Sequence, residues 1–521
     1  MNARAEGVDL VAALWAAMES EGPAISFAGK TITFRQLRTR IQTVAANLQR
    51  RGMQPGDRVL FSVRPGIDSM VLALAMVTVG ATVVFADPGA GRALFETRAK
   101  LAAARWVAAE SVLFAASTPL VRPLARARGI DLPDYSRIIE DPQVVFSGPW
   151  LPGVPRGAHS LRSLEKPRGV PTPLTEQHGD TDALIIFTSG TTSVPKGVVH
   201  TRHTLGAGLA DVSEGLGFRP GQRVLTDQLM IGVPALIAGA HWIMPKYGLD
   251  PGAAPEDYLP LLGDADAAFL TPASMNAVLD ALGDRTLPGL ELVAMGGAPV
   301  LSPLLRRIRT TMPNAKIRAI YGMTEALPVA IADGHEKLRR DPADGDWVGR
   351  IVSSVSARIA ADGELLIEGP GIARGYLHEL PNELVTLPSG DLARIDDGDL
   401  GPELTMLARK KDMLIRDRTN IYPALYEPVI VTLPGVAEAY IVGVPDEIGD
   451  DRVVLALVLA ADAAAGTPAA VERALPGLID HAALPDAVVR IDAVPRSGRQ
   501  SKPDREALSK LVAPMLEESQ R

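Results

Sequence analysis

The stretch "DALIIFTSGTTSVPKGVV", residues 182–199, runs from an apolar segment directly into a loop of glycine, serine and threonine. A short apolar run bounded by turn residues predicts a buried strand. The backbone N–H groups and hydroxyls of such a loop can surround phosphate oxygens, and Lys196 can offset their charge. The order differs from a Walker A loop, in which Gly-Lys-Ser/Thr opens a helix, because Lys196 precedes Gly197. By composition alone, the loop is equally consistent with a polar turn.

Alternating helical and strand patterns indicate the fold class. Residues 20–110 pair amphipathic segments such as "TITFRQLRTRIQTVAANLQRRG" with short apolar strands such as "DRVLFSV", which is typical of parallel α/β units. The alternation returns over residues 181–330, short β patterns dominate residues 345–408, and a smaller α/β unit begins near residue 412. Residues 117–180 are rich in proline and arginine, and we expect an irregular connection that contains short elements. At roughly 100–200 residues per domain, the length predicts two or more domains.

Composition and charge exclude several classes of protein. The net charge is −8 and no basic stripe stands out, so a nucleic-acid partner is not expected. The chain has no cysteine, which excludes disulfides, thiolate metal sites and a cysteine nucleophile. The longest uncharged run, Ser69–Ala86, contains Gly80, and we expect a buried helix followed by a strand there rather than a membrane span. The N-terminal segment reads as an amphipathic helix rather than a signal peptide, so a cytoplasmic protein is expected.

The residue order in "FTSGTTSVPKGVV" resembles the phosphate loop of the adenylate-forming enzymes, the superfamily of acyl-CoA synthetases, luciferases and peptide-synthetase adenylation domains. Further segments resemble motifs of this superfamily in the same order along nearly the whole chain: "YGMTEALP", "GELLIEGPGIARGYL", "SGDLARIDDGDL", "ARKKDMLIRDRTNIYP" and "SKPDREAL". The resemblance implies an α/β fold. Residues 1–410 would form a large N-terminal adenylation domain of α/β subdomains plus a β-rich subdomain, and residues 411–521 a small mobile α+β C-terminal domain.

The reaction implied by the resemblance joins a carboxylic acid to ATP, giving an acyl adenylate and pyrophosphate, usually followed by acyl transfer. A carboxylate is already ionised near neutral pH, because model carboxyl pKa values lie at about 4. Attack on the α-phosphorus therefore needs no general base, and the enzyme contributes positioning and charge neutralisation. ATP and Mg²⁺ are the implied cofactors, and CoA is a candidate acyl acceptor.

The resemblance also implies catalytic roles for individual residues. Lys196 would bind the β- and γ-phosphates, Thr324 would contact the α-phosphate, and Glu325 would hold Mg²⁺, which prefers oxygen ligands. Lys502 would reach the substrate carboxylate and the α-phosphate, where charge develops during adenylation. Lys411 would be the hinge about which the C-terminal domain rotates between half-reactions.

A larger set of residues would bind the nucleotide. The loop would hold the phosphates, Tyr321 would stack on adenine, and Asp391 with Arg409 would bind the ribose hydroxyls. The full set implied to contact ATP or AMP is Thr188, Ser189, Gly190, Thr191, Thr192, Gly296, Gly297, Ala298, Tyr321, Gly322, Asp391 and Arg409. His200 and His203 follow the loop and are interpreted as structural, with a supporting place behind the acyl pocket as the alternative.

Two outcomes for the second half-reaction stay open. Acyl-CoA ligases commonly carry Gly-Gly after the hinge, where the backbone lines the pantetheine tunnel, whereas this chain has Asp417 and Arg418. Bulky charged side chains there would narrow the tunnel. "FADPGAGR", "YGMTEALPVA" and "RQSK" are similar to the β-lactone synthetases of bacterial olefin pathways, in which a β-hydroxyl of the substrate displaces AMP without CoA. In contrast, "NIYP" and "ARKKDM" are typical of acyl-CoA ligases.

The acyl substrate is expected to be of the fatty type. The segments that would line the acyl pocket, residues 227–245 and 269–280, are aliphatic with small residues and carry no obvious cation for a second carboxylate. Ordinary core segments would look the same, so these segments predict no chain length. A small-molecule carboxylic acid is thus the expected partner, with a carrier protein or pathway enzymes as macromolecular candidates. A non-catalytic nucleotide sensor is a third alternative, but it would be expected to lack Lys502, Glu325 or the phosphate loop.

Overall fold

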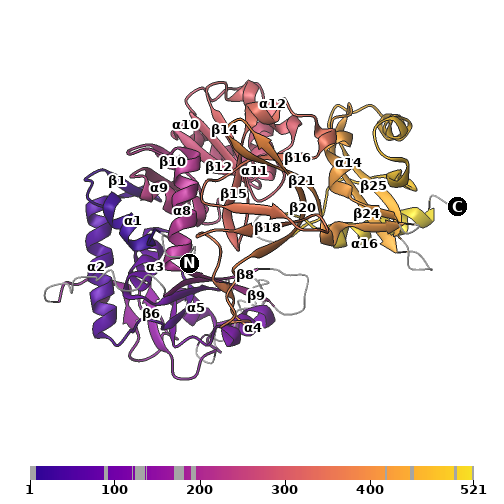
Figure 1. Cartoon of the computed structure of the whole chain (residues 1–521). Helices are drawn as coiled ribbons and strands as arrows, with labels where there is room; N and C mark the ends of the chain where they lie inside the picture. Colours follow the sequence, from indigo (N-terminus) through magenta and orange to yellow (C-terminus); the bar gives the residue numbers. More distant parts are fainter. Residues whose placement is uncertain are drawn as a thin grey trace.

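The computed structural model describes residues 8–86, 92–119, 121–123, 135, 138–168, 181–188, 195–416, 419–445, 451–497 and 502–518. These residues form a large N-terminal α/β domain followed by a smaller C-terminal domain (Figure 1). Two large sheets organise the N-terminal domain, and the fold class predicted from the sequence is confirmed.

The eight-stranded sheet has the order β19-β9-β8-β4-β3-β5-β6-β7. It is parallel from β8 to β7, and β9 and β19 add to it in antiparallel fashion. Its strands are β3 (Arg58–Ser62), β4 (Thr82–Phe85), β5 (Trp106–Glu110), β6 (Gln143–Ser147), β7 (His159–Ser160), β8 (Asp182–Thr188), β9 (Lys196–Thr201) and β19 (Gly375–Tyr376). The helices of this part of the chain are α2 (Phe34–Arg50), α3 (Ile67–Val79), α4 (Arg92–Ala102), α5 (Ser111–Ala116) and α7 (Leu161–Leu164).

The thirteen-stranded sheet has the order β17-β18-β20-β21-β16-β15-β14-β13-β12-β10-β11-β1-β2. It is parallel from β14 to β1, β2 pairs antiparallel with β1 at the edge, and the half from β17 to β15 is antiparallel. The half from β14 to β2 consists of β1 (Pro23–Phe27), β2 (Lys30–Thr33), β10 (Arg223–Leu225), β11 (His241–Met244), β12 (Ala267–Leu270), β13 (Leu292–Gly296) and β14 (Lys316–Met323). The antiparallel half consists of β15 (Ala326–Asp333), β16 (Asp346–Ile351), β17 (Ser356–Ile359), β18 (Glu364–Glu368), β20 (Leu387–Gly398) and β21 (Gly401–Arg409). The strands after β15 correspond to the β-rich stretch predicted over residues 345–408, whereas β15 precedes it. Helical elements of this region are α1 (Leu10–Ala17), α8 (Arg202–Leu216), α9 (Leu229–Ile237), α10 (Pro255–Gly263), α11 (Pro272–Leu282), α12 (Ser302–Thr311), α13 (Gly334–Lys337) and η2 (Pro342–Asp344).

Helix α8 packs against both sheets, through β8 and β9 on one and β15 on the other (Figure 1). The contact with β15 requires a residue without a side chain, because a Cβ at Gly208 would lie 2.5 Å from the carbonyl oxygen of Leu327. At the start of α8, the guanidinium of Arg202, 3% exposed, lies 2.6 Å from Asp9 at the N-cap of α1. Tight packing of α8 thus fixes the two sheets relative to each other.

The C-terminal domain is built on a three-stranded sheet with the order β24-β25-β26 (Figure 1, right). The elements after β21 are η3 (Lys410–Asp412), β22 (Leu414–Arg416), β23 (Thr419–Ile421), α14 (Pro423–Ile430), β24 (Val436–Pro445), β25 (Asp451–Leu459), α15 (Thr467–Ala474), η4 (Leu475–Gly477), η5 (His481–Ala483), β26 (Ala487–Arg490), β27 (Arg496–Ser497), β28 (Lys502–Pro503) and α16 (Arg505–Glu518). Helix α14 contacts η2, β16 and β21 of the N-terminal domain.

Local sequence signals place many of these boundaries. Thr33 caps α2 and forms a capping box with Gln36, and Gly80, with φ of +88°, ends α3 just before β4, as expected. Residues 117–180 do contain short elements, and two of them, β6 and β7, extend the eight-stranded sheet. Within the described ranges, no helix is long and apolar enough to cross a membrane.

Candidate active site

The predicted phosphate loop connects two antiparallel strands of the eight-stranded sheet. Strand β8 ends at Thr188, β9 begins at Lys196, and these two residues are register partners. The ammonium of Lys196 lies 5.1 Å from the ring centroid of Tyr376 on β19. Four predicted phosphate-binding residues lie outside the described residues: Ser189, Gly190, Thr191 and Thr192.

The predicted ribose and adenine residues come together from three strands of the large sheet, β14, β20 and β21. The Tyr321 hydroxyl donates a hydrogen bond to Asp391 Oδ2 at 2.7 Å. Arg409, the register partner of Asp391, places its Nε 3.1 Å from Oδ1. Burial raises the pKa of Asp391, against the opposing effects of Arg409 and the Tyr321 hydroxyl. Burial and the nearby carboxylate raise the pKa of Tyr321, so its hydroxyl stays protonated and donates.

The predicted glycine turn lies beside Tyr321. Gly296 ends β13 and is the register partner of Ile320 on β14, directly before Tyr321. Gly297 has φ of +83°, a left-handed conformation that favours glycine. Gly322 also sits in a crowded position, because a Cβ there would lie 2.9 Å from the carbonyl oxygen of Ala326. The backbone of this turn and the Tyr321 ring therefore share one end of the sheet.

The segment Thr324–Glu325 forms the turn from β14 to β15, and it is held from two sides. His200, buried on β9, donates from Nε2 to the carbonyl oxygen of Thr324 at 2.8 Å, and its Nδ1 lies 3.2 Å from the Thr204 hydroxyl. Burial lowers the pKa of His200, which keeps the ring neutral. The Tyr376 hydroxyl lies 3.0 Å from Glu325 Oε1. His200 therefore supports this turn, which fits the structural interpretation of that residue.

Lys502 comes to this region from the C-terminal domain. It lies on β28, three residues before α16 begins at Arg505, and is exposed. Its pKa is lowered by partial desolvation and by the positive charges of Arg409 and Lys411, and Asp391 and Glu325 act in the opposite direction. The ammonium thus lies within electrostatic reach of residues from both the ribose and the Thr324–Glu325 regions.

The segment between the domains is anchored on both sides of Lys411. Lys410 Nζ lies 2.6 Å from both Asp362 and Glu364 of the N-terminal domain. On the other side, Asp412 lies 3.3 Å from Arg505 of the C-terminal domain. Lys411 is therefore the residue that separates an anchor on one domain from an anchor on the other.

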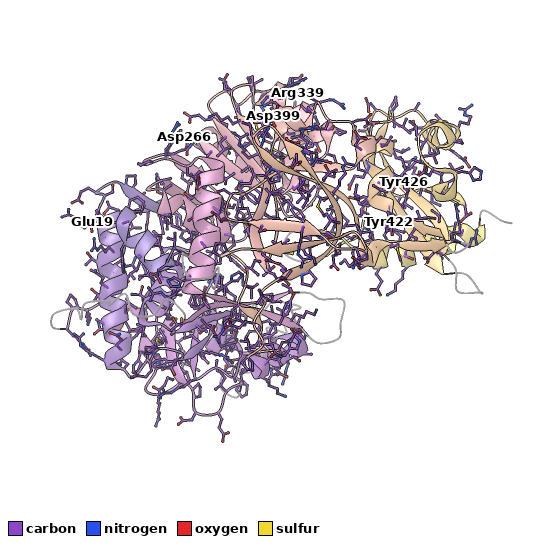
Figure 2. All side chains as sticks on the ribbon, in the orientation of Figure 1. Glu19, Asp266, Arg339, Asp399, Tyr422 and Tyr426 are labelled. Carbon is purple, nitrogen blue, oxygen red and sulfur yellow. The ribbon has the colours of Figure 1, made fainter. Side chains whose placement is uncertain are left out.

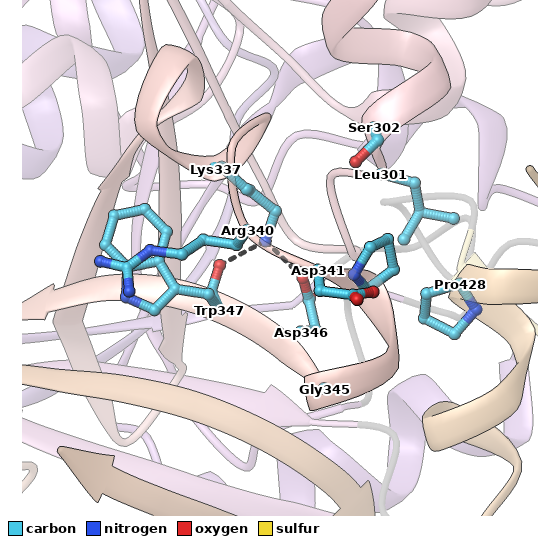
Figure 3. A pocket seen from close by; sticks show the side chains of 10 residues that line it. Leu301, Ser302, Lys337, Arg340, Asp341, Gly345, Asp346, Trp347 and Pro428 are labelled. Atoms are coloured by element: carbon cyan, nitrogen blue, oxygen red, sulfur yellow. Dashed lines mark hydrogen bonds and ion pairs between the residues drawn. The ribbon is translucent and has the colours of Figure 1, made fainter.

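A separate small pocket of about 20 Å³ lies where α14 meets the N-terminal domain (Figure 3). Pro428 of α14 and Leu301 line it together, and Lys337 is bonded to the Trp347 carbonyl oxygen and to Asp346 (Figure 3). None of the residues predicted to bind substrate lines it. This pocket is part of the contact between the domains.

The described residues contain no group of three or more His, Asp or Glu that could hold a metal ion.

Sequence reasoning missed two residues whose contacts the structure reveals, Tyr376 in the site and Arg505 beside the hinge segment. Tyr376 lies inside the quoted segment "GELLIEGPGIARGYL", yet only its tertiary contacts with Lys196 and Glu325 reveal a role. Arg505 lies inside "SKPDREAL", three residues after Lys502, and binds Glu427 through two hydrogen bonds of 2.7 and 2.6 Å. The sequence signal that could have found them is their type and place: an aromatic residue and an arginine, each inside a recognised motif. Asp417 and Arg418 lie outside the described residues.

Comparisons with known proteins identify the family. The sequence model described as AMP-binding enzyme matches residues 13–377, and that of the AMP-binding enzyme C-terminal domain matches residues 426–500. An olefin β-lactone synthetase of Stenotrophomonas maltophilia is 28% identical over 470 residues, covering 80% of this chain and 79% of the relative. A 4-coumarate–CoA ligase of Narcissus pseudonarcissus is 25% identical over 457 residues, covering 81% and 78%. ATP-bound MatB from Rhodopseudomonas palustris has a similar structure, with a TM-score of 0.76 at 22% identity, covering 99% of this chain and 100% of MatB. The chain belongs to the AMP-binding enzyme family and is an AMP-forming ligase.

Proposed function

We propose that this enzyme activates a fatty-type carboxylic acid as its acyl adenylate and then transfers the acyl group to CoA or to the pantetheine thiol of a carrier protein. The observation that carries the proposal is the convergence of Lys196, Glu325, Tyr321, Asp391 and Lys502 from distant segments of the chain. The aliphatic segments 227–245 and 269–280 support a fatty-type acid as the substrate.

The nucleotide would lie across the junction between the two sheets. Tyr321, Gly322 and the turn Gly296–Ala298 are proposed to contact adenine, and Asp391 is proposed to accept hydrogen bonds from the ribose hydroxyls. Arg409 holds the Asp391 carboxylate by its Oδ1 atom, which orients the acceptor before ribose arrives. The loop from Thr188 to Thr192 and Lys196 would hold the phosphates, because backbone amides, hydroxyls and one cation match phosphate oxygens.

The residues present fit a magnesium ion that arrives with ATP. Mg²⁺ is usually held by one or two carboxylates together with substrate phosphates and water, so a cage made only of protein ligands is not required. Glu325 provides such a carboxylate, with Oε1 oriented by the Tyr376 hydroxyl. When bound, Mg²⁺ would neutralise negative charge on the phosphate oxygens.

In the adenylation step, a substrate carboxylate oxygen attacks the α-phosphorus of ATP, and the bond to the β-phosphate oxygen breaks. Negative charge develops on the α-phosphate oxygens and on the departing pyrophosphate. Lys502 is proposed to stabilise the charge at the α-phosphate and Lys196 the charge on pyrophosphate. Thr324 is proposed to contact the α-phosphate, since His200 fixes the position of the Thr324 backbone.

We propose that residues 1–410 and 411–521 are separate domains that rotate about Lys411 between the two half-reactions. Ion pairs hold Lys410 to the N-terminal domain and Asp412 to the C-terminal domain, which leaves the backbone of Lys411 to absorb the rotation. The present orientation, with Lys502 near Asp391 and Glu325, suits adenylation. A rotation would withdraw Lys502 and bring another face of the small domain to the acyl adenylate.

A second candidate is adenylation of a 2-alkyl-3-hydroxy fatty acid, followed by closure to a β-lactone. In that closure, the 3-hydroxyl oxygen attacks the acyl carbon, loses its proton and displaces AMP. A relative of this kind, an olefin β-lactone synthetase, is 28% identical to the chain and supports this candidate, while CoA ligases of 25–29% identity support the first. The charged residues Asp417 and Arg418 at positions that commonly hold glycine in CoA ligases favour it as well.

The identity of the product distinguishes the two candidates. Purified enzyme would receive ATP, Mg²⁺ and a panel of fatty and 2-alkyl-3-hydroxy fatty acids, with and without CoA, and the products would be analysed by mass spectrometry. CoA-dependent thioester supports the first candidate, and a CoA-independent product lighter than the hydroxy acid by one water supports the second. Accumulation of enzyme-bound acyl-AMP alone would indicate a carrier-protein acceptor. No AMP formation with any acid would contradict both candidates.

The lowered pKa of Lys502 predicts loss of adenylation at alkaline pH. The ammonium is lost as the pH rises through this lowered pKa, which lies below the ordinary value of 10.5. The rate of carboxylate-dependent exchange between ATP and pyrophosphate should therefore fall as the pH rises from neutral toward this ordinary lysine pKa. Lys502→Arg keeps its charge in this range and should shift the decline to higher pH. If the rate of this variant falls over the same pH range as that of the wild type, the fall is caused by titration of another group.

A further inference from the structure

The segment Ile372–Leu377 connects the two places where the proposed function puts phosphate and metal. On one side, it pairs with β9, through Arg374 N–H to the Val199 carbonyl at 2.8 Å and Leu377 N–H to the Gly197 carbonyl at 2.7 Å. On the other side, Ala373 N–H donates to the Glu325 carbonyl at 2.7 Å. The segment therefore ties the strand that begins with Lys196 to the turn that carries Glu325.

Within this segment, Tyr376 contacts both charged side chains. Its ring faces the Lys196 ammonium, with 5.1 Å between Nζ and the ring centroid, and its hydroxyl lies 3.0 Å from Glu325 Oε1. Burial and the neighbouring Glu325 raise the pKa of Tyr376, so the hydroxyl is protonated and donates the hydrogen bond. Lys196 and Glu325 each contact Tyr376, and among the described residues no ion pair joins the two directly.

We propose that Tyr376 is a positioning residue that keeps Lys196 and Glu325 apart and separately oriented, so that each stays available to ATP and Mg²⁺. A lysine and a glutamate on facing segments attract each other, and a direct ion pair would satisfy both charges before substrate binds. The ring of Tyr376 instead holds the ammonium over its face, while its hydroxyl holds the carboxylate by one oxygen and leaves the other oxygen for metal. This inference rests on the proposed adenylation site.

Two substitutions separate the contacts of Tyr376. Tyr376→Phe keeps the ring under Lys196 and removes the hydrogen bond to Glu325, and Tyr376→Leu removes both contacts. ATP binding would be measured by titration calorimetry in the whole protein, once without Mg²⁺ and once across a Mg²⁺ series. Tyr426→Phe is the matched control, because Tyr426 also bonds a carboxylate, Asp480 at 2.9 Å, and lies on the C-terminal domain (Figure 2).

In Tyr376→Phe, metal-free ATP affinity should stay at the wild-type value, while the Mg²⁺ concentration for half-maximal enhancement should rise about tenfold, as for one lost hydrogen bond to a charged group. In Tyr376→Leu, metal-free ATP affinity should fall as well, by about threefold or more, because the cation–π contact is lost. The Tyr426→Phe control should match wild type in both measurements. Melting temperatures of all variants report whether the substitutions unfold the protein.

An unchanged Mg²⁺ dependence in Tyr376→Phe would overturn the inference, provided that wild type binds ATP in a Mg²⁺-dependent way. Equal losses of metal-free affinity in Tyr376→Phe and Tyr376→Leu, accompanied by lower melting temperatures, would also overturn it, because such losses reflect folding alone. Failure of wild type to bind ATP would instead contradict the proposed function, which makes the two failures distinguishable.

Discussion

Replacing Lys502 with alanine is expected to lower the rate of adenylation by about 10²–10³-fold, the usual effect of removing one group that stabilises developing charge. ATP affinity should change little, because the proposed contacts to adenine, ribose and the β- and γ-phosphates all come from the N-terminal domain. Lys502 instead lies on β28 of the C-terminal domain. Its ammonium interacts electrostatically with Asp391 and Glu325. Carboxylate-dependent exchange between ATP and pyrophosphate measures the adenylation rate, and calorimetry measures ATP binding.

Lys510→Ala is the matched control for this experiment. Lys510 lies on α16 of the same domain and pairs with Glu506, and both side chains are largely exposed. Its removal deletes one positive charge near Lys502 in sequence without touching the proposed site, so adenylation should stay at the wild-type rate. An undiminished exchange rate in Lys502→Ala would show that a different cation stabilises the α-phosphate. Equal losses in the two variants would show that the effect arises from net charge.

Local sequence signals predict the elements better than the contacts between them. The glycine at the end of α3 and the capping box at Thr33 depend on residues adjacent in the chain, so both boundaries are readable. The proline- and arginine-rich stretch contains β6, a five-residue strand that its local sequence did not predict. This strand is stabilised by parallel pairing with β5. Pairing of this kind depends on residues distant in sequence and leaves no local pattern.

The candidate site shows the same division. Six ordered motifs, recognised by resemblance, predict that Tyr321, Asp391 and Lys502 belong to one site, and no periodicity or spacing could bring these residues together. The hydrogen bonds that support the site could not be predicted from these motifs. His200 on β9 bonds the Thr324 carbonyl in the turn after β14, and α8 lies close to β15 at Gly208. That geometry depends on the packing of two sheets and is visible only in the fold.

The arginine that follows Lys502 carries the second large expected effect, and this effect is on stability. Arg505 forms two hydrogen bonds to Glu427, one to the Ile441 carbonyl at 2.9 Å, and an ion pair with Asp412. The side chains of Arg505 and Glu427 are 23% and 11% exposed. Because breaking a buried ion pair leaves an unpaired charge behind, Arg505→Met should reduce the free energy of unfolding of the C-terminal domain by about 3 kcal/mol.

Loss of Arg505 should also weaken adenylation, because Arg505 begins the helix that follows Lys502 and holds Asp412 beside the hinge. Urea unfolding of the whole protein, followed by proteolysis to locate the destabilised region, measures the first effect, and exchange between ATP and pyrophosphate measures the second. Arg473→Met is the control, since Arg473 lies exposed on α15 and bonds the Ala469 carbonyl within its own helix.

The double variant Arg505→Met with Glu427→Gln tests the cause of the destabilisation. It removes the carboxylate that would otherwise remain unpaired, while the amide oxygen of glutamine can still accept the 2.7 Å hydrogen bond from Ile441 N–H. Much of the lost stability should therefore return, because replacing both partners of a buried pair is often nearly neutral. Adenylation should stay below wild type, because Asp412 would still lack its anchor on the C-terminal domain. Full recovery of both stability and adenylation would show that Arg505 only neutralises Glu427 and does not position Lys502.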